Sequence, residues 1–138
     1  LAANGLSVVY LGPDDNMYVG LGDEDVTNIR QELKSKYKLF VAKGILAEDY
    51  GIAPKSSWAD YVFSKNYNLL KISEVATFIQ KNNHLPDVPS AEQVAEEGYS
   101  QHDMNKVLLQ KIEELTLYTI QQQKEIDALK TQLLESKK

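Results

Sequence analysis

The residues of this 138-residue chain best suited to chemistry are two histidines and one serine–lysine group. His84 and His102 lie 18 residues apart and match neither the HxxxH nor the HExxH spacing of a metal site. We therefore expect a structural or surface role for each histidine. Lys55 directly precedes Ser56 and Ser57, and a Ser–Lys arrangement can supply a nucleophile and its base. Adjacent placement in a polar stretch is more typical of a linker, so we predict no catalysis there.

Other sites of chemistry are not indicated by the sequence. The chain has no cysteine, which removes disulfide and zinc-thiolate chemistry, and no pair among its 20 acidic residues stands out as acid and base. Gly20 and Gly22 do not belong to a phosphate-binding motif. The net charge is -5, the basic residues are scattered, and no apolar run could cross a membrane. We expect no enzyme activity, no cofactor, no nucleic-acid partner and no membrane insertion.

The strongest pattern is a heptad seam in the last third of the chain, where apolar positions recur at alternating steps of four and three. The seam residues alternate between heptad positions d and a and are Leu108, Ile112, Leu115, Thr119, Gln122, Ile126, Leu129 and Leu133. A repeat of 3.5 residues is buried by winding against copies of itself or against a partner helix. It predicts a coiled-coil helix over 101–138, with one amphipathic helix on a globular core as the alternative.

The two halves of this helix differ in composition. Apolar residues also occur off the seam within 107–120, whereas after Gln121 they lie almost only at a and d. We expect other segments to cover the first half and water to surround the second. In a parallel coil Glu125, at position g, would face Lys130, at position e, of the neighbouring chain.

The N-terminal part of the chain has β character. Runs at 6–11 and 17–21 flank the turn-forming residues 12–16 and predict a hairpin, which must pair with something further because a lone hairpin is barely stable. Residues 23–37 have acidic residues first and basic residues last, which favours a short helix. Residues 38–45 return to β character. We assign 1–54 to a β-rich, fibre-like segment.

The middle part, residues 55–100, has the densest aromatic cluster. Trp58, Tyr61 and Phe63 lie close together, and Phe78 lies on the apolar face of a predicted helix near 72–79. We predict that these four aromatic residues are core anchors of a small helical domain and pack against the upper half of the coil. The alternative is a docking surface for carbohydrate or for another aromatic group.

Helix ends are also predicted in this region. Ser90 with Gln93 forms a capping box, Gly98 ends the short helix that follows, and Ser100 caps the long terminal helix. Together these elements predict an α+β chain with three parts, namely 1–54, 55–100 and the coiled-coil helix 101–138. The composition of the seam alone suits dimers as well as trimers, and we expect an intertwined trimer because of the family resemblance that follows.

The sequence resembles a C-terminal module of Bacteroidetes-group surface proteins and phage tail-fibre-like proteins. The matching stretches cover about 100 residues and read YKLFVAKGI, WADYVF, NLLKISEVATFIQKNNHLPDVPSAEQVAEEG and MNKVLLQKIEELTLYTI. Such proteins often have a GIGTTxP-like turn before YKL, where this chain has residues 20–25 and a helix-like insertion. The layout is also similar to the intramolecular chaperones of endosialidases, but the Ser-Asp self-cleavage pattern is missing at 55–60.

The resemblance implies a trimerisation and folding module at the end of a longer extracellular protein, on a cell surface or a virion tail fibre. Its partners would be two further copies of the chain. One alternative is a receptor- or glycan-binding tip, and another is an autoproteolytic chaperone of a tail spike. In the leading interpretation the coil brings the chains into register, so that slow non-local β pairing follows at a high effective concentration.

Overall fold

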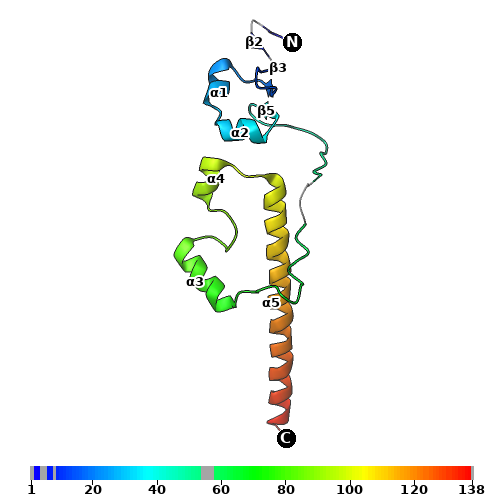
Figure 1. The fold of residues 1–138 in the computed structure, drawn as a ribbon. Helices are drawn as coiled ribbons and strands as arrows, with labels where there is room; N and C mark the ends of the chain where they lie inside the picture. Colours follow the sequence, from blue (N-terminus) through cyan, green and yellow to red (C-terminus); the bar gives the residue numbers. More distant parts are fainter. Residues whose placement is uncertain (1, 4–5, 8, 54–57, 138) are drawn as a thin grey trace. The chain divides into compact units, whose positions relative to one another are not determined.

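The computed structural model describes residues 2–3, 6–7, 9–53 and 58–137. The chain has the mixed α+β fold that the sequence predicts, and it contains a small three-stranded sheet and a long C-terminal helix (Figure 1). It divides into two compact units, unit 1 (Leu1–Gly51) and unit 2 (Ile52–Lys138), and each is described by itself. The predicted helical domain and the predicted coil helix both fall within unit 2.

Unit 1 is built around a sheet in the order β3 (Val9–Leu11), β4 (Met17–Val19), β5 (Leu39–Val41). The strands β3 and β4 form the predicted antiparallel hairpin, and β5 joins β4 in parallel. A shorter antiparallel pair, β1 (Ala2–Ala3) with β2 (Leu6–Ser7), precedes them. The register places three aromatic rings side by side on one face of the sheet, where cross-strand pairs stabilise it; these are Tyr10, Tyr18 and Phe40, with ring centroids 5.2 and 5.3 Å apart.

Parallel pairing of β4 with β5 requires a crossover between them, and residues 20–38 provide it. The single helix predicted at 23–37 is in fact two short helices, α1 (Asp23–Asn28) and α2 (Gln31–Lys36). Ile29 and Arg30 have extended backbone angles, which end the first helix before the second begins. The hairpin turn is tied to this crossover because the buried Asn16 donates its side-chain amide hydrogen to the carbonyl of Lys34, at 3.0 Å.

Position 12 in the hairpin turn requires glycine because other side chains lie very close to its Cα atom. A Cβ atom at this position would come within 2.7 Å of the Tyr18 ring and of the Asp14 carboxylate. The Tyr18 hydroxyl in turn donates a 2.6 Å hydrogen bond to that carboxylate. The turn and the buried ring of Tyr18 therefore form one unit of packing.

Unit 2 consists of an irregular segment at 58–70 followed by α3 (Ile72–Asn82), α4 (Ala91–Glu97) and the 35-residue α5 (Gln101–Glu135). The predicted caps are confirmed. The Ser90 hydroxyl accepts from the Gln93 amide at 3.2 Å, and the Gln93 side chain accepts from the Ser90 amide at 2.9 Å. Gly98 ends α4 with a φ of 66°, and Ser100 caps α5. The helices α3 and α4 lie beside the upper half of α5 (Figure 1).

Candidate functional site

The upper half of α5 is held by its own chain along one continuous row of side chains, which we call the outer ridge. Its members recur every four residues and are His102, Lys106, Gln110, Glu114 and Tyr118. Each contacts a successive part of the 58–70 segment. Because a helix turns about 100° per residue, a step of four advances the row by about 40°. The segment therefore winds around the helix as it descends.

The first contacts of the outer ridge are aromatic. The Trp58 ring lies 5.9 Å from the His102 ring, and the Lys106 ammonium lies 5.7 Å from the centre of the Tyr61 ring. The Tyr61 hydroxyl then donates to the side-chain oxygen of Gln110, at 2.5 Å. These contacts fix the start of the 58–70 segment against α5.

A polar cluster in the middle of the ridge surrounds the buried Gln110, whose amide nitrogen donates to Glu114 at 2.9 Å and to the Tyr67 oxygen at 3.2 Å. The Tyr67 hydroxyl donates to the Glu114 carboxylate. Lys111 pairs with Glu114 at 2.9 Å and with Asp87 at 3.1 Å, so the loop after α3 is tied to the same point. Lys111 and the Gln110 amide nitrogen supply donors and the two carboxylates supply acceptors, so these groups satisfy one another. The Lys111 and Glu114 side chains are 13 and 14% exposed, whereas that of Asp87 is 63% exposed.

The charges in the polar cluster follow from these bonds. Burial alone would raise the pKa of Glu114, but hydrogen bonds from Tyr67, Gln110 and Lys111 outweigh it and hold that pKa below its usual value. Burial, and then the bond to Glu114, raise the pKa of Tyr67. The cluster therefore contains an ionised carboxylate and a neutral phenol at neutral pH, joined by a hydrogen bond.

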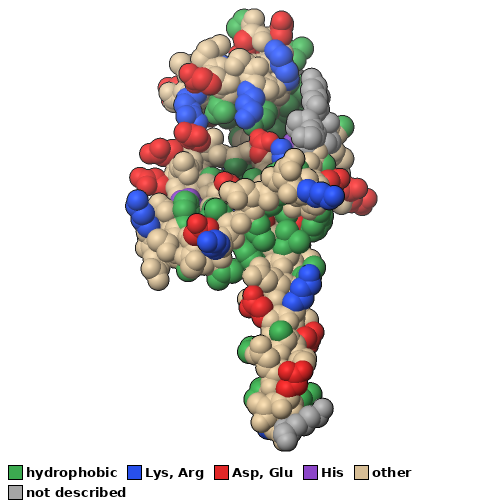
Figure 2. Space-filling model, turned by 60° about the horizontal axis from the view of Figure 1, so that its bottom comes forward, with side chains coloured by type: hydrophobic (Ala, Val, Ile, Leu, Met, Phe, Trp, Pro, Cys, Tyr) green, Lys and Arg blue, Asp and Glu red, His purple; other side chains and the backbone are tan. Residues whose placement is uncertain are grey.

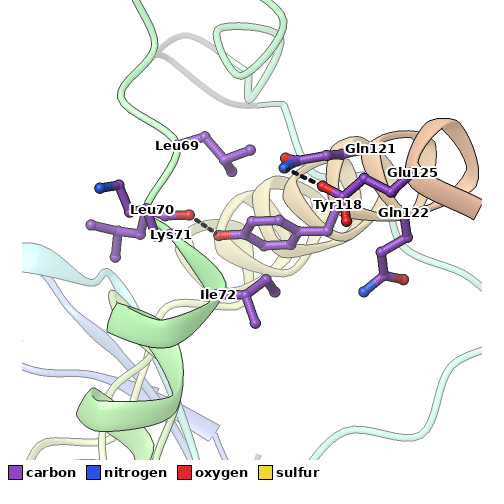
Figure 3. A pocket seen from close by; sticks show the side chains of 8 residues that line it. All are labelled: Leu69, Leu70, Lys71, Ile72, Tyr118, Gln121, Gln122 and Glu125. Carbon is purple, nitrogen blue, oxygen red and sulfur yellow. Dashed lines mark hydrogen bonds between the residues drawn. The ribbon is translucent and has the colours of Figure 1, made fainter. Parts of the chain in front are cut away.

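The lower end of the outer ridge is the buried Tyr118, whose hydroxyl donates to the carbonyl of Leu70 at 2.6 Å (Figure 3). Below this point α5 has no covering segment, and every described residue from 119 to 137 is exposed. In the space-filling view this part is a stalk with charged side chains along it (Figure 2). The predicted contrast between a covered first half and a bare second half is confirmed in the single chain.

The seam is uncovered along its whole length. Its six apolar side chains are 46–63% exposed, and Thr119 and Gln122 are exposed as well. The seam faces away from Gln110, which lies at the centre of the outer ridge and is only 8% exposed. The chain thus covers the side of α5 opposite the seam and leaves the heptad face free.

An apolar hollow of about 530 Å³ opens beside the upper seam, and we call it the groove. Its floor is formed by Leu108, Ile112 and Leu115 of the seam. Its wall comes from three places, which are the end of the 58–70 segment, α3, and the loop 85–89 that we call the proline loop. The wall residues are Leu70, Ile72, Val75, Leu85 and Pro86. A second hollow of about 360 Å³ shares Leu70, Ile72 and Tyr118 with the groove and extends it down to Glu125 (Figure 3).

The four predicted aromatic anchors differ in their burial. Trp58, Tyr61 and Phe63 are 45, 38 and 59% exposed in the single chain, and Phe78 is half-buried with its ring edge-on to His84. The residues of this turn that are fully buried are Ala59 and Val62. Trp58 and Tyr61 do contact the upper part of α5, at the outer ridge. Small side chains fill the tight space under the turn, and the large rings lie over its edges.

The histidines and the serine–lysine group form no reactive arrangement that the structure describes. His102 lies against Trp58, and His84 contacts the carbonyl of Leu85 with its ring nitrogen at 2.9 Å. Among the described residues, no group of three or more acidic or histidine side chains could hold a metal ion. Lys55, Ser56 and Ser57 lie outside the described residues. The described helices include none long and apolar enough to span a membrane.

Comparisons with protein-family models, with curated proteins and with solved structures found no match to this chain. The site therefore has to be interpreted from its own geometry. Its two parts are the uncovered seam and the groove beside it.

Proposed function

We propose that this chain is a non-enzymatic trimerisation and folding module that joins three copies in parallel through the seam. The observation that carries the proposal is the exposure of all eight seam residues while the chain covers the opposite side of the same helix. A heptad pattern kept over four repeats is typical of a helix that winds against copies of itself. A helix serving only as a cover for its own core would turn this face inward.

The energetics favour association. Complete burial of a Leu or Ile side chain stabilises by about 1.5–3 kcal/mol, and the six apolar seam residues are about half exposed. Their burial between chains would contribute on the order of 5 kcal/mol per chain. The described residues of the bare part of α5 are all exposed in one chain, and most helical stability in proteins comes from packing of an apolar face rather than from intrinsic propensity. It gains its stability when another helix lies along it.

A second unpartnered apolar surface supports the same proposal in unit 1. Strand alternation places the aromatic row on one face of the sheet and leaves Leu11, Met17 and Leu39 together on the other. These three side chains are 72, 40 and 50% exposed. Exposed apolar patches of this kind mark interaction surfaces. In a fibre built from three chains, this patch would be covered in each copy.

The polar seam residues agree with a role in setting register. Thr119 already donates its hydroxyl hydrogen to the carbonyl of Leu115, at 2.9 Å, so this layer tolerates burial without a partner. Gln122 presents an amide, which around a symmetric axis can bond its counterparts or a shared water. The trimeric state, the extracellular fibre and the folding role follow from the resemblance described above together with this seam.

The test is a pair of variants that differ only in the face they alter. Ile126 lies in the seam and Ala128 lies on the opposite side of the bare part of α5, so neither touches the covered half. By multi-angle light scattering we expect three times the chain mass for the unaltered protein and for Ala128→Asp, and a monomer for Ile126→Asp. Circular dichroism of the whole chain checks that each variant keeps its helical content. A monomer mass for the unaltered protein at micromolar concentration would overturn the proposal.

A binding tip is the second candidate, because Trp58 and Phe63 expose large aromatic surfaces that could stack on a sugar. A glycan array on the assembled protein tests it, with Trp58→Ala as the matched variant. Binding that disappears in this variant would favour a binding tip. An array without signal would favour the trimerisation and folding function only. The serines that the self-cleavage alternative concerns, Ser56 and Ser57, lie outside the described residues.

A further inference from the structure

The groove and the seam cannot be occupied independently. Leu108, Ile112 and Leu115 form the floor of the groove and are also three consecutive seam positions. A helix that lies on the seam must therefore lie against the groove wall as well. The wall stands on one flank of the seam, the g flank, because Tyr118 and Glu125 are at g and line the hollow shown in Figure 3.

Ile120 lies on the other flank of the seam and has no explanation within one chain. It is 47% exposed and stands at heptad position b, outside the seam. Ile120 is two residues from Tyr118, about 200° around the helix. The 58–70 segment ends its course on the Tyr118 side and leaves Ile120 uncovered. An exposed isoleucine beside a seam indicates an additional contact with whatever the seam binds.

We propose that the groove is an intersubunit site that receives Ile120 of the neighbouring copy against Leu70 and Ile72. This inference rests on the proposed parallel assembly. In a parallel coil the g flank of one helix meets the e flank of the next, and position b lies directly outside e. The wall beside Tyr118 overhangs its own g flank, so it reaches the position that a neighbour's residue 120 occupies at the same height.

Charge complementarity identifies the occupant as a second copy in parallel orientation. Glu125 lies at the lower end of the second hollow, which extends the groove, and Lys130 is the e residue that a parallel neighbour in register brings opposite it. Lys130 is mostly exposed and only loosely paired with Asp127, at 3.7 Å, so it is free to reach across. An antiparallel neighbour would instead bring its own wall to the same flank, and the two walls would compete for one space.

This contact would let the part of unit 2 that precedes α5 set the register of the chains, which the coil alone does not do. Heptad seams allow two, three or more helices, and they allow slips by whole heptads. A groove that accepts one side chain at one height excludes the slipped arrangements. The wall formed by α3 and the proline loop therefore selects the register of the neighbouring chain.

Cysteine cross-linking tests the contact, because the chain contains no cysteine of its own. Chains with Ile72→Cys alone and chains with Ile120→Cys alone are co-refolded and treated with a short bismaleimide. We expect a covalent dimer in the mixture and little in either variant alone. The matched control replaces Ile120→Cys by Leu134→Cys, at the same heptad position but about 21 Å further along the helix. It should give no dimer with Ile72→Cys.

The outcomes separate this inference from the proposed function. If scattering shows an assembled protein and the Ile72–Ile120 pair does not cross-link, the groove inference is wrong and the seam assembly stands. If the protein is a monomer, both fail. Equal cross-linking by Leu134→Cys would also overturn the inference, because it would show that any exposed position reacts.

A second measurement covers the case in which the cysteine variants fold poorly. Ile120→Asn should weaken assembly at least tenfold in a dilution series, because the groove would receive a polar side chain. Leu134→Asn, at the same heptad position, should weaken it less than threefold. Equal effects of the two substitutions would contradict the proposed contact, and occupation by a peptide of another protein would leave both dilution curves unchanged.

Discussion

Replacing Tyr67 by Phe removes one hydroxyl from the polar cluster and leaves the ring in place. That hydroxyl donates to the Glu114 carboxylate and accepts from Gln110. A hydrogen bond to a charged group contributes about 1.5–3 kcal/mol to stability. The carboxylate keeps Gln110 and Lys111 as partners, and its side chain is 14% exposed, so the cost should fall near the lower end. We expect unfolding to become easier by about 1.5–2 kcal/mol.

Urea unfolding at one fixed chain concentration measures this effect, since stability would depend on chain concentration in the proposed assembly. With a slope of about 2 kcal/mol per molar urea, the midpoint should fall by roughly 1 M. Tyr99→Phe is the matched control because its side chain is 54% exposed, and it should change stability by less than about 0.5 kcal/mol. A double-mutant cycle with Glu114→Gln isolates the bond. A coupling energy below about 0.5 kcal/mol would refute the importance of the cluster.

Three further predictions concern acid, a cap and the seam. The pKa of Glu114 is lowered in the folded chain, so its contribution to stability is present above the unfolded pKa of about 4.3 and is lost as pH falls through the folded pKa; the difference in melting temperature between the unaltered protein and Glu114→Gln should shrink in that range. Ser90→Ala removes the bond from Gln93 and should cost about 1 kcal/mol by urea unfolding, with Ser90→Gly costing less. Thr119→Ile combined with Gln122→Leu should raise the melting temperature and give mixed oligomers by scattering. A single oligomeric species in unaltered register would show that Thr119 and Gln122 affect only stability and do not set the register.

The helical parts of the fold could be predicted because their signals are local. The serine caps, the glycine at the end of α4 and the heptad spacing each lie within a few residues of the structure they determine. The parallel pairing of β5 with β4 could not be predicted, because it joins segments about 20 residues apart and depends on a crossover. The break between α1 and α2 carries no glycine or proline that would have revealed it.

The outer ridge was missed for a different reason. Its members are polar, charged or aromatic, so no apolar periodicity connects them. Their common feature is that they recur every four residues, on the side of α5 opposite the seam. This row can be recognised only when its partners Tyr61, Tyr67 and Leu70 are known. The sequence indicates the aromatic cluster, but large rings are the usual candidates for a core. The most buried residues of this turn are instead the small side chains Ala59 and Val62.

The geometry of the outer ridge explains why the seam stays free. The ridge begins at His102, on one flank of α5, and four steps of about 40° carry it through about 160° to Tyr118 on the other flank. A fifth step would reach Gln122, which belongs to the seam. The covering segment leaves the helix at that point, through the bond from Tyr118 to Leu70, and turns into α3. A segment that covered one turn more would occupy part of the heptad face, so the length of the 58–70 segment limits how much of α5 one chain covers. In the proposed assembly the neighbouring copies bind the face that is left free.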